Sequence, residues 1–311
     1  MGEADGVWER QVRLLPHSAW RVPDALLSVS SSCRLQDLVI TTKLFFGTKP
    51  GVNNKGLSRK HILEGIEASL KRLQLSYVDV LFCHRPDPVT PIEEVCRAMN
   101  WCIEQGKAFY WGTSEWSGCQ LTEAIGVCDR LGLIRPCVEQ PEYNVFARQR
   151  VEVEYEPVYA LSGMGLTTWS PLASGILTGK YSGKHVPAGS RLALDQYKFL
   201  LNDKFGASAW QVDAADELTP IAAELGCSAA QLALAWCLTN KRVSSVILGA
   251  TSVAQLEENL ACLQVLPKLT ADVVARVEAI GGGKGKPAPH SSFTQVHSMR
   301  DTARVAYSKG F

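Results

Sequence analysis

The chain has 311 residues, of which 46% are hydrophobic and 20% are charged, as in globular proteins with a large core. Its formal net charge of +1 provides none of the basic excess that marks nucleic-acid-binding proteins. Its longest apolar stretches, such as QLALAWCLTN at 231–240, are too short for a membrane helix, and residues 1–20 hold no apolar run like that of a secretory signal.

From residue 37 the sequence alternates between β-rich runs and amphipathic helical patterns. Strands are predicted at 37–43, 77–83, 108–114, 136–140, 165–170 and 244–250, and helices at 58–75, 91–106, 118–132, 150–162 and 252–264, with more helices before residue 240. Short strand–helix units predict a parallel sheet with right-handed crossovers. Because no Gly-x-Gly-x-x-Gly follows a strand, the α/β pattern favours a (β/α)8 TIM barrel, here with six units instead of eight.

Ten cysteines are scattered singly along the chain, without C-x-x-C or zinc-finger spacing. Several lie within apolar helical patterns, where a thiol behaves as a small hydrophobic group. They indicate reduced core thiols in a cytoplasmic protein, and no metal site is predicted.

Polar or ionisable residues stand at the end of each predicted strand. They are Lys43, His84, Ser114 with Glu115, Gln140, Trp169 with Ser170, and Thr251, which follows Gly249 and Ala250 after the sixth strand. In a barrel the carboxyl ends of the strands converge on the face that carries the active site. His84 alone also fits a residue that caps its strand and meets solvent, and Lys43 alone fits a surface lysine. Six such ends in succession favour a shared site.

Several strings resemble those of aldo-keto reductases, and within that superfamily the plant-type potassium-channel β-subunits. The strings include LVITTK, GLSRKHILEGIEASLKRLQLSYVDVLFCHRPDP, YWGTSEWS, VEQPEYNVFARQ and TTWSPLASGILTGKY. The resemblance implies a barrel domain over 37–280. A non-matching segment, 1–36, precedes it, and a Gly/Lys/Pro-rich tail, 281–311, follows it and is predicted to be flexible.

The resemblance also implies that NADPH binds across the barrel mouth and passes hydride to an aldehyde or ketone. Lys43 would tune the catalytic acid, and His84 would orient the substrate carbonyl. Ser114 and Gln140 would hydrogen-bond the nicotinamide carboxamide. Tyr143 fits a framework residue, and equally a stacked aromatic of the core.

The remaining cofactor residues implied by the resemblance begin at Trp169. The pyrophosphate would be wrapped by Trp169, Ser170, Pro171, Leu172, Ala173 and Ser174. Lys180 and Arg191 would supply positive charge to the phosphates, including the 2′-phosphate that separates NADPH from NADH. The adenosine end would be held by Gln255, Glu258 and Asn259, and Gly249 and Thr251 complete the implied cofactor set.

The family's catalytic set also includes an aspartate and a proton-donating tyrosine in a DTAxxY string, which does not occur in these 311 residues. The first tyrosine is Tyr77. One explanation is a truncated or mis-assembled gene product, which the abrupt change between Cys33 and Leu38 favours. The other is a real shortened relative that no longer reduces carbonyls.

Three functional hypotheses follow. The first is an NADPH-dependent reductase of small aldehydes or ketones, impaired in this chain. The second is a regulatory subunit, a homotetramer docked on the α-subunit of a voltage-gated potassium channel, that uses NADPH as a redox sensor. It would be cytoplasmic and peripheral to the membrane through that partner. The third is an inactive fragment.

Overall fold

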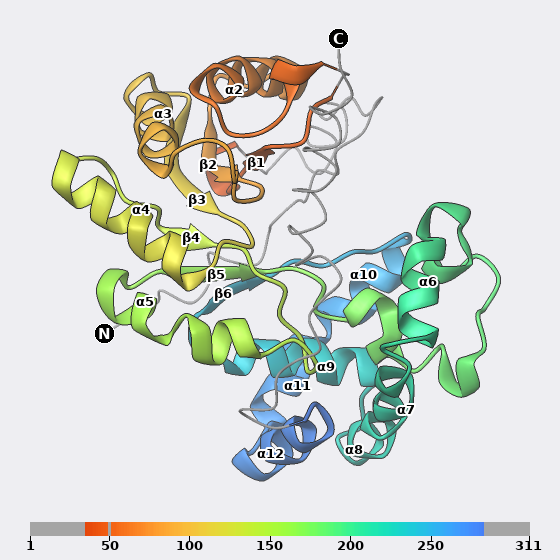
Figure 1. The fold of residues 1–311 in the computed structure, drawn as a ribbon. Coiled ribbons are helices and arrows are strands. Elements are labelled where there is room, and N and C mark those ends of the chain that lie inside the picture. The colour runs from red at the N-terminus through yellow and green to blue at the C-terminus, as the bar shows by residue number, and fades with distance from the viewer. Residues whose placement is uncertain (1–34, 49–50, 283–311) are drawn as a thin grey trace. The chain divides into compact units, whose positions relative to one another are not determined.

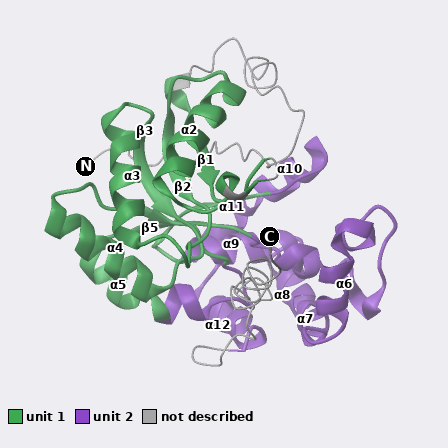
Figure 2. Cartoon of the chain, turned by 45° about the horizontal axis from the view of Figure 1, so that its top comes forward, with its two compact units in different colours: residues 1–142, 154–169, 240–248 green, residues 143–153, 170–239, 249–311 purple. Residues whose placement is uncertain are grey.

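The computed structural model describes residues 35–48 and 51–282 (Figure 1). The predicted N-terminal segment and C-terminal tail therefore lie outside the described residues, apart from 35–36 and 281–282. The chain divides into two compact units (Figure 2). Unit 1 comprises residues 1–142, 154–169 and 240–248, and unit 2 comprises residues 143–153, 170–239 and 249–311.

Unit 1 is built on a parallel sheet of six strands in sequential order. The strands are β1 (Thr41–Leu44), β2 (Val78–Cys83), β3 (Ala108–Thr113), β4 (Val138–Glu139), β5 (Gly165–Thr168) and β6 (Val243–Val246). Each strand pairs in parallel with the next one. The prediction of an α/β fold with a parallel, barrel-type sheet of six strands is confirmed.

Four helices link the first five strands of unit 1. They are α2 (Arg59–Leu73), α3 (Ile92–Glu104), α4 (Gly118–Leu131) and α5 (Glu156–Ser162). Ser58 caps α2 by accepting a hydrogen bond from the His61 amide, and Ser117 forms a capping box with Gln120 at the start of α4. These local signals start the helices where the sequence pattern places them.

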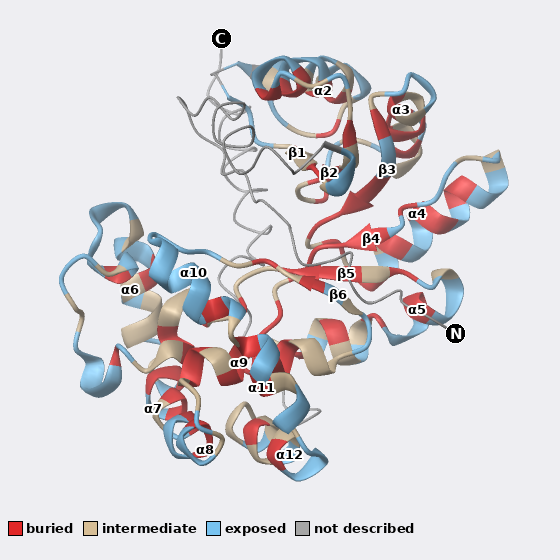
Figure 3. Cartoon of the chain, turned by 180° about the vertical axis from the view of Figure 1, so that it is seen from behind, coloured by how far each residue is buried: buried red, intermediate tan, exposed pale blue. Residues whose placement is uncertain are grey.

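The core of unit 1 lies between the sheet and these helices, where buried residues gather (Figure 3). Leu81 and Trp111 of the strands are fully buried there, as are Ile62 and Ile66 of α2. Trp111 also donates from its indole nitrogen to the Ile134 carbonyl at 2.7 Å. The alternation along a strand then turns Phe82 and Gly112 to the opposite face of the sheet.

Unit 2 is mainly helical. After short 3-10 turns it contains α6 (Lys198–Phe205), α7 (Trp210–Asp216), α8 (Leu218–Glu224), α9 (Ala229–Thr239), α10 (Val253–Leu260), α11 (Cys262–Val265) and α12 (Ala271–Ile280). Helix α9 is apolar all round, and Leu232, Leu234 and Trp236 are almost completely buried. Tyr143 is also buried and stacks on Trp236, with ring centroids 5.1 Å apart, so it is a stacked core aromatic.

Several elements differ from the prediction. The strand predicted over 244–250 spans Val243–Val246, and the helix predicted over 252–264 is divided into α10 and α11. The first strand begins at Thr41 instead of 37, because the Asp79 carboxylate accepts from the Ile40 amide at 2.7 Å. The helix predicted over 150–162 is divided into a π-helical segment, Arg150–Glu154, and α5. Helix α12 was not predicted, although Thr270 caps it and Val273 and Val277 form its buried stripe.

Among the described residues, no single helix is long and apolar enough to cross a bilayer; one bent pair, Trp210–Glu224 with Ala229–Thr239, meets the criteria of length and composition. The nine cysteines in the described part of the chain are free thiols, six of them buried.

Candidate active site

Five sequence-predicted site residues lie in unit 1 at the carboxyl ends of its strands. Lys43 lies within β1, and His84, Ser114, Gln140 and Trp169 follow β2, β3, β4 and β5. Because the strands are parallel and pair in sequential order, these ends lie along one edge of the sheet. The strand order thus brings five predicted site residues to one edge of the sheet. This edge is the candidate active site.

Lys43 and His84 stand on neighbouring strands. Lys43 pairs in register with Phe82, and its Nζ lies 5.2 Å from the centroid of the Phe82 ring. The backbone N–H of His84 donates to the Leu44 carbonyl at 2.9 Å and so extends the ladder by one bond. Its imidazole packs edge-on against Phe46, with centroids 5.0 Å apart. An ammonium and an imidazole are thereby presented, half-buried, at adjacent strand ends.

Ser114 and Gln140 are both buried and directly joined. The Ser114 hydroxyl donates to the Gln140 carbonyl at 2.8 Å, and the Gln140 amide Nε2 donates to Thr167 Oγ1 at 3.1 Å. The backbone N–H of Gln140 also donates to the Thr113 carbonyl at 2.8 Å. A hydroxyl and a primary amide are thus fixed side by side, with the donors and acceptors that a carboxamide group requires.

Two further residues join this edge: Arg85, which the sequence did not single out, and Glu115, which was predicted as a strand-end residue but given no role in cofactor binding. Arg85 donates from Nη1 to the Ser114 hydroxyl at 3.2 Å and lies over the Trp169 ring, 5.8 Å from its centroid. Glu115 accepts from the Trp169 indole Nε1 at 2.9 Å. Each of them is adjacent in sequence to a predicted site residue. A charged residue next to a polar strand end is therefore the sequence feature by which both could have been assigned to the site.

A buried carboxylate supports the edge from within unit 1. Glu139 is fully buried and accepts hydrogen bonds from Thr113 Oγ1 and from the Trp116 amide, the latter at 3.3 Å. The Tyr155 hydroxyl contacts the same carboxylate at 3.4 Å. Nearby, burial raises the pKa of the Cys83 thiol well above its ordinary value, with smaller contributions from Cys102 and Glu139. Through its bonds to Thr113 and Trp116, Glu139 fixes the backbone on both sides of Ser114, and Glu139 itself directly precedes Gln140.

In unit 2, the predicted pyrophosphate segment forms a turn with an unusual backbone. Ser170, Ala173 and Ser174 have φ values of 53°, 47° and 62°, and Gly175 has 94°. The turn is closed by hydrogen bonds from Ala173 N to Ser170 O at 2.9 Å and from Gly175 N to Leu172 O at 2.8 Å. Successive backbone N–H groups in a turn can form a concave nest that binds anions. Pro171 and Leu172 lie within this turn, the former buried.

The two predicted phosphate-binding cations belong to the same region of unit 2. A Cβ at Gly175 would lie 3.0 Å from Lys180 Cε and 3.2 Å from its Nζ, so the glycine allows the ammonium to approach the turn. Lys180 also lies over the Tyr181 ring at 5.3 Å. The Tyr181 hydroxyl accepts from the Leu192 amide at 3.4 Å, next to Arg191, whose guanidinium lies 4.6 Å from the Tyr197 ring centroid. Lys180 and Arg191 are both exposed.

Gln255, Glu258 and Asn259, the residues predicted at the adenosine end, lie within α10 of unit 2. Gln255 Oε1 accepts from the Thr251 amide at 2.9 Å and from the Thr251 hydroxyl at 3.0 Å. Asn259 is buried, whereas Gly249, Thr251, Gln255 and Glu258 are exposed. The Glu258 carbonyl accepts from Gln231 Nε2 at 2.9 Å, which ties α10 to α9. This group is held by the local bonds between Gln255 and Thr251 and by the longer-range bond from Gln231.

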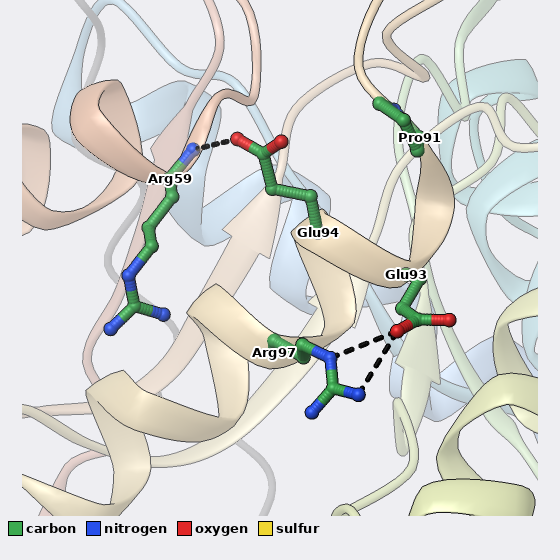
Figure 4. Close-up of a pocket in the computed structure, with 5 residues that line it drawn as sticks. All are labelled: Arg59, Pro91, Glu93, Glu94 and Arg97. Carbon is green, nitrogen blue, oxygen red and sulfur yellow. Dashed lines mark hydrogen bonds and ion pairs between the residues drawn. The ribbon is translucent and has the colours of Figure 1, made fainter.

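A separate pocket of about 410 Å³ lies between α2 and α3 of unit 1 (Figure 4). It is lined by Arg59, Pro91, Glu93, Glu94 and Arg97. Glu94 accepts from the Arg59 amide at 2.8 Å, and Glu93 pairs with Arg97 and Arg130. Hydrogen bonds from these two arginines hold the pKa of Glu93 below its ordinary value. None of the predicted site residues lines this pocket. No cluster of histidine, cysteine and carboxylate side chains in the described part of the chain is arranged to hold a metal ion.

Comparison with known proteins decides the family. The family model "Aldo/keto reductase family" matches residues 25–281. The chain belongs to the aldo/keto reductase family. The matched region begins twelve residues before the predicted boundary at 37 (37 − 25), and that boundary stays a prediction. Members of this family generally use NADH or NADPH.

Two plant proteins are similar to this aldo/keto reductase family member over most of its length. One is a protein from Oryza sativa subsp. japonica and the other is from Arabidopsis thaliana, and each is named "Probable voltage-gated potassium channel subunit beta". Each is 56% identical over 253 residues, which is 81% of this chain and 76% of the relative. The resemblance to channel β-subunits stated from the sequence is confirmed.

Proposed function

We propose that this chain binds NADPH. In unit 1, the Ser114 hydroxyl and the Gln140 amide hold the carboxamide of the nicotinamide ring. In unit 2, the turn at 170–175 and the exposed cations Lys180 and Arg191 hold phosphate groups. The observation that carries the proposal is the Ser114–Gln140 pair, buried at the strand ends and fixed by three hydrogen bonds. A preformed amide of this kind is suited to a carboxamide ligand because neither group needs to reorganise on binding.

The test is a titration with NADPH, monitored by the fluorescence of the reduced cofactor. Replacing Gln140→Leu keeps the shape of the side chain but removes its amide, and we expect affinity to fall by about tenfold. Gln105→Leu, at an exposed position after α3, is the matched control and should leave affinity unchanged. Equal affinities of the two variants would contradict the placement of the carboxamide.

We further propose that the 311-residue chain reduces an aldehyde or ketone weakly, in a reaction for which NADPH would supply the hydride. Lys43 and His84 are the catalytic residues in this proposal. A positioned general acid contributes about 10² to 10⁴-fold to such a reaction, and the chain has no tyrosine before Tyr77 to serve in the family's DTAxxY string. His84 would orient the carbonyl, the Lys43 ammonium would favour the developing alkoxide, and a water molecule would supply the proton that completes the alcohol.

Reduction of 4-nitrobenzaldehyde tests this second step. A family-type segment carrying DTAxxY, placed before Asp37, should raise turnover strongly, and His84→Ala in that longer protein should lower it. If the 311-residue chain already reduces the aldehyde at the rate of the longer protein, the proposed impairment is wrong. If His84→Ala has no effect in either form, the role given to the imidazole is wrong.

A regulatory role is a second candidate, supported by the 56% identity to two proteins named as potassium-channel β-subunits. In this role the chain assembles as a homotetramer on the α-subunit of a voltage-gated potassium channel and is held at the membrane by that partner. Co-expression with such an α-subunit should yield a complex that survives purification in detergent. Light scattering that finds only monomers at micromolar concentration would contradict the tetramer, and with it the channel role.

A further inference from the structure

The indole ring of Trp169 is held in place by two charged side chains of unit 1. The Glu115 carboxylate accepts from the indole Nε1 at 2.9 Å, and the Arg85 guanidinium lies 5.8 Å from the ring centroid. The backbone of Trp169 is fixed as well, since its N–H donates to the Pro141 carbonyl at 3.1 Å. The orientation of the ring is thus set by partners far away in sequence, with Glu115 54 positions earlier.

The same carboxylate oxygen has a second partner. Glu115 Oε1 accepts from the Glu142 amide at 2.6 Å, and Glu142 forms an isolated parallel bridge with Trp169. One side chain therefore joins the segments that follow β3, β4 and β5. These segments carry Ser114, Gln140 and Trp169, three of the predicted cofactor residues.

The backbone at Glu115 is strained. Its φ is 62°, a left-handed conformation that glutamate rarely adopts. The neighbours on each side are held, because the Ser114 hydroxyl bonds to the Gln140 carbonyl and the Trp116 amide bonds to Glu139. Such strain persists only where the surroundings determine the conformation, and it gathers at functional sites. At this position it accompanies a carboxylate that reaches both the indole nitrogen and the Glu142 amide.

We propose that Glu115 is a positioning residue for the cofactor: its carboxylate holds the indole ring of Trp169 in the orientation against which a planar ring of the nucleotide cofactor stacks. The inference rests on the proposed binding of NADPH. Stacking requires a defined tilt of the aromatic ring, and an indole that rotates about its side-chain bonds loses affinity through the entropy of ordering it. Glu115 itself contacts no cofactor atom in this proposal and acts through Trp169.

Two variants separate the hydrogen bond from the charge and from the strain. Glu115→Gln keeps the length of the side chain and an Oε1 acceptor but removes the charge. Glu115→Asn is one methylene shorter, so its oxygen does not reach Trp169, while asparagine tolerates the left-handed backbone better than glutamate. The asparagine variant loses two hydrogen bonds but relieves part of the backbone strain, so the thermal unfolding of each variant is measured and affinities are compared at a temperature at which all variants are folded.

The experiment uses the full chain labelled with ¹⁵N-tryptophan. The indole N–H signal of Trp169 is assigned by its disappearance in Trp169→Phe. We expect this signal to stay near its parent position in Glu115→Gln and to move in Glu115→Asn, in the absence of cofactor. In NADPH titrations, affinity should stay within about twofold for the glutamine variant and fall about tenfold for the asparagine variant.

The outcomes distinguish the inference from the proposed function. If the parent binds NADPH and the asparagine variant binds equally well, Glu115 positions nothing and the inference is overturned. If glutamine and asparagine weaken binding equally, the charge is responsible and the positioning role is also overturned. If the parent fails to bind NADPH, the proposed function itself fails, while the indole signal still decides whether Glu115 holds the ring.

Discussion

The two units present their predicted cofactor residues in different ways. In unit 1, Ser114 and Gln140 are buried, bonded to each other, and set by the register of six paired strands. In unit 2, Lys180, Arg191 and Gln255 are exposed, and their contacts are ring faces or residues close in sequence. Strand ends built into a sheet are preorganised, whereas exposed cations on turns gain order only from what they bind.

This difference separates stability from affinity. A change at the strand ends of unit 1 disturbs bonds that also hold the sheet together, so it should alter both the free energy of unfolding and the binding of cofactor. If the exposed cations of unit 2 bind phosphate as proposed, a change to one of them should alter binding and leave the free energy of unfolding almost unchanged.

The largest effect is expected for Glu139→Ala in unit 1. The variant leaves the buried Thr113 hydroxyl and Trp116 amide without their acceptor, so the free energy of unfolding should fall by about 3 kcal/mol. Urea denaturation measures this loss. Glu123→Ala, at an exposed position of α4, is the control and should have almost no effect. Similar losses in the two variants would mean that the buried carboxylate does not support the strand ends.

Arg191→Ala tests the expectation that a change in unit 2 alters cofactor affinity but not stability. If the guanidinium meets the 2′-phosphate, its removal costs about 1.5–3 kcal/mol of binding, or about 10- to 150-fold in the affinity for NADPH. Affinity for NADH and resistance to urea should be unchanged, because Arg191 is exposed. The control is Arg276→Ala, which removes a half-buried arginine paired with Glu224 on a different helix. Equal losses for NADPH and NADH would rule out the 2′-phosphate contact.

Ser114→Ala should affect both properties, unlike Arg191→Ala. The hydroxyl donates to the Gln140 carbonyl and accepts from Arg85. Arg85 is half-buried and keeps its bond to the His84 carbonyl, so we expect the loss of the buried bond to dominate and to lower the free energy of unfolding by about 1 kcal/mol. NADPH affinity should fall with it. Ser244→Ala, at an exposed position of β6, serves as the control in the same denaturation and titration experiments. A loss of affinity without any loss of stability would mean that Ser114, as expected for the exposed residues of unit 2, contributes to binding but not to stability.

The smallest effect concerns acid stability. Burial lowers the pKa of His61 below 6.5, against the opposing influence of the Asn53 backbone, Glu64 and Asp87. The folded state thus favours the neutral imidazole, and the unfolded state binds more protons between the lowered pKa and 6.5. Stability should be complete above pH 6.5 and fall as the pH drops through this window. His61→Gln should flatten the dependence of urea denaturation on pH, and His185→Gln, at an exposed position, is the control.

Much of unit 1 could be predicted from local patterns. Alternating apolar residues located β2 and β3 to within one residue, and Ser58 and Gly132 mark the start of α2 and the end of α4 in the sequence itself. The start of β1 could not be predicted this way, because the Asp79 carboxylate, 39 positions away, takes the Ile40 amide. Helix α12 was missed although its cap, Thr270, is a local signal.

The sequence by itself determined which residue types stand at the ends of the strands, because hydrophobic periodicity fixes where each strand stops. Only the tertiary structure decided how those residues are joined. The bonds from Arg85 to Ser114 and from Trp169 to Glu115 connect positions 29 and 54 apart, and they depend on strand register and on the left-handed backbone at Glu115. Neither leaves a local pattern, because a hydrogen bond between distant residues is selected by the geometry of the folded sheet.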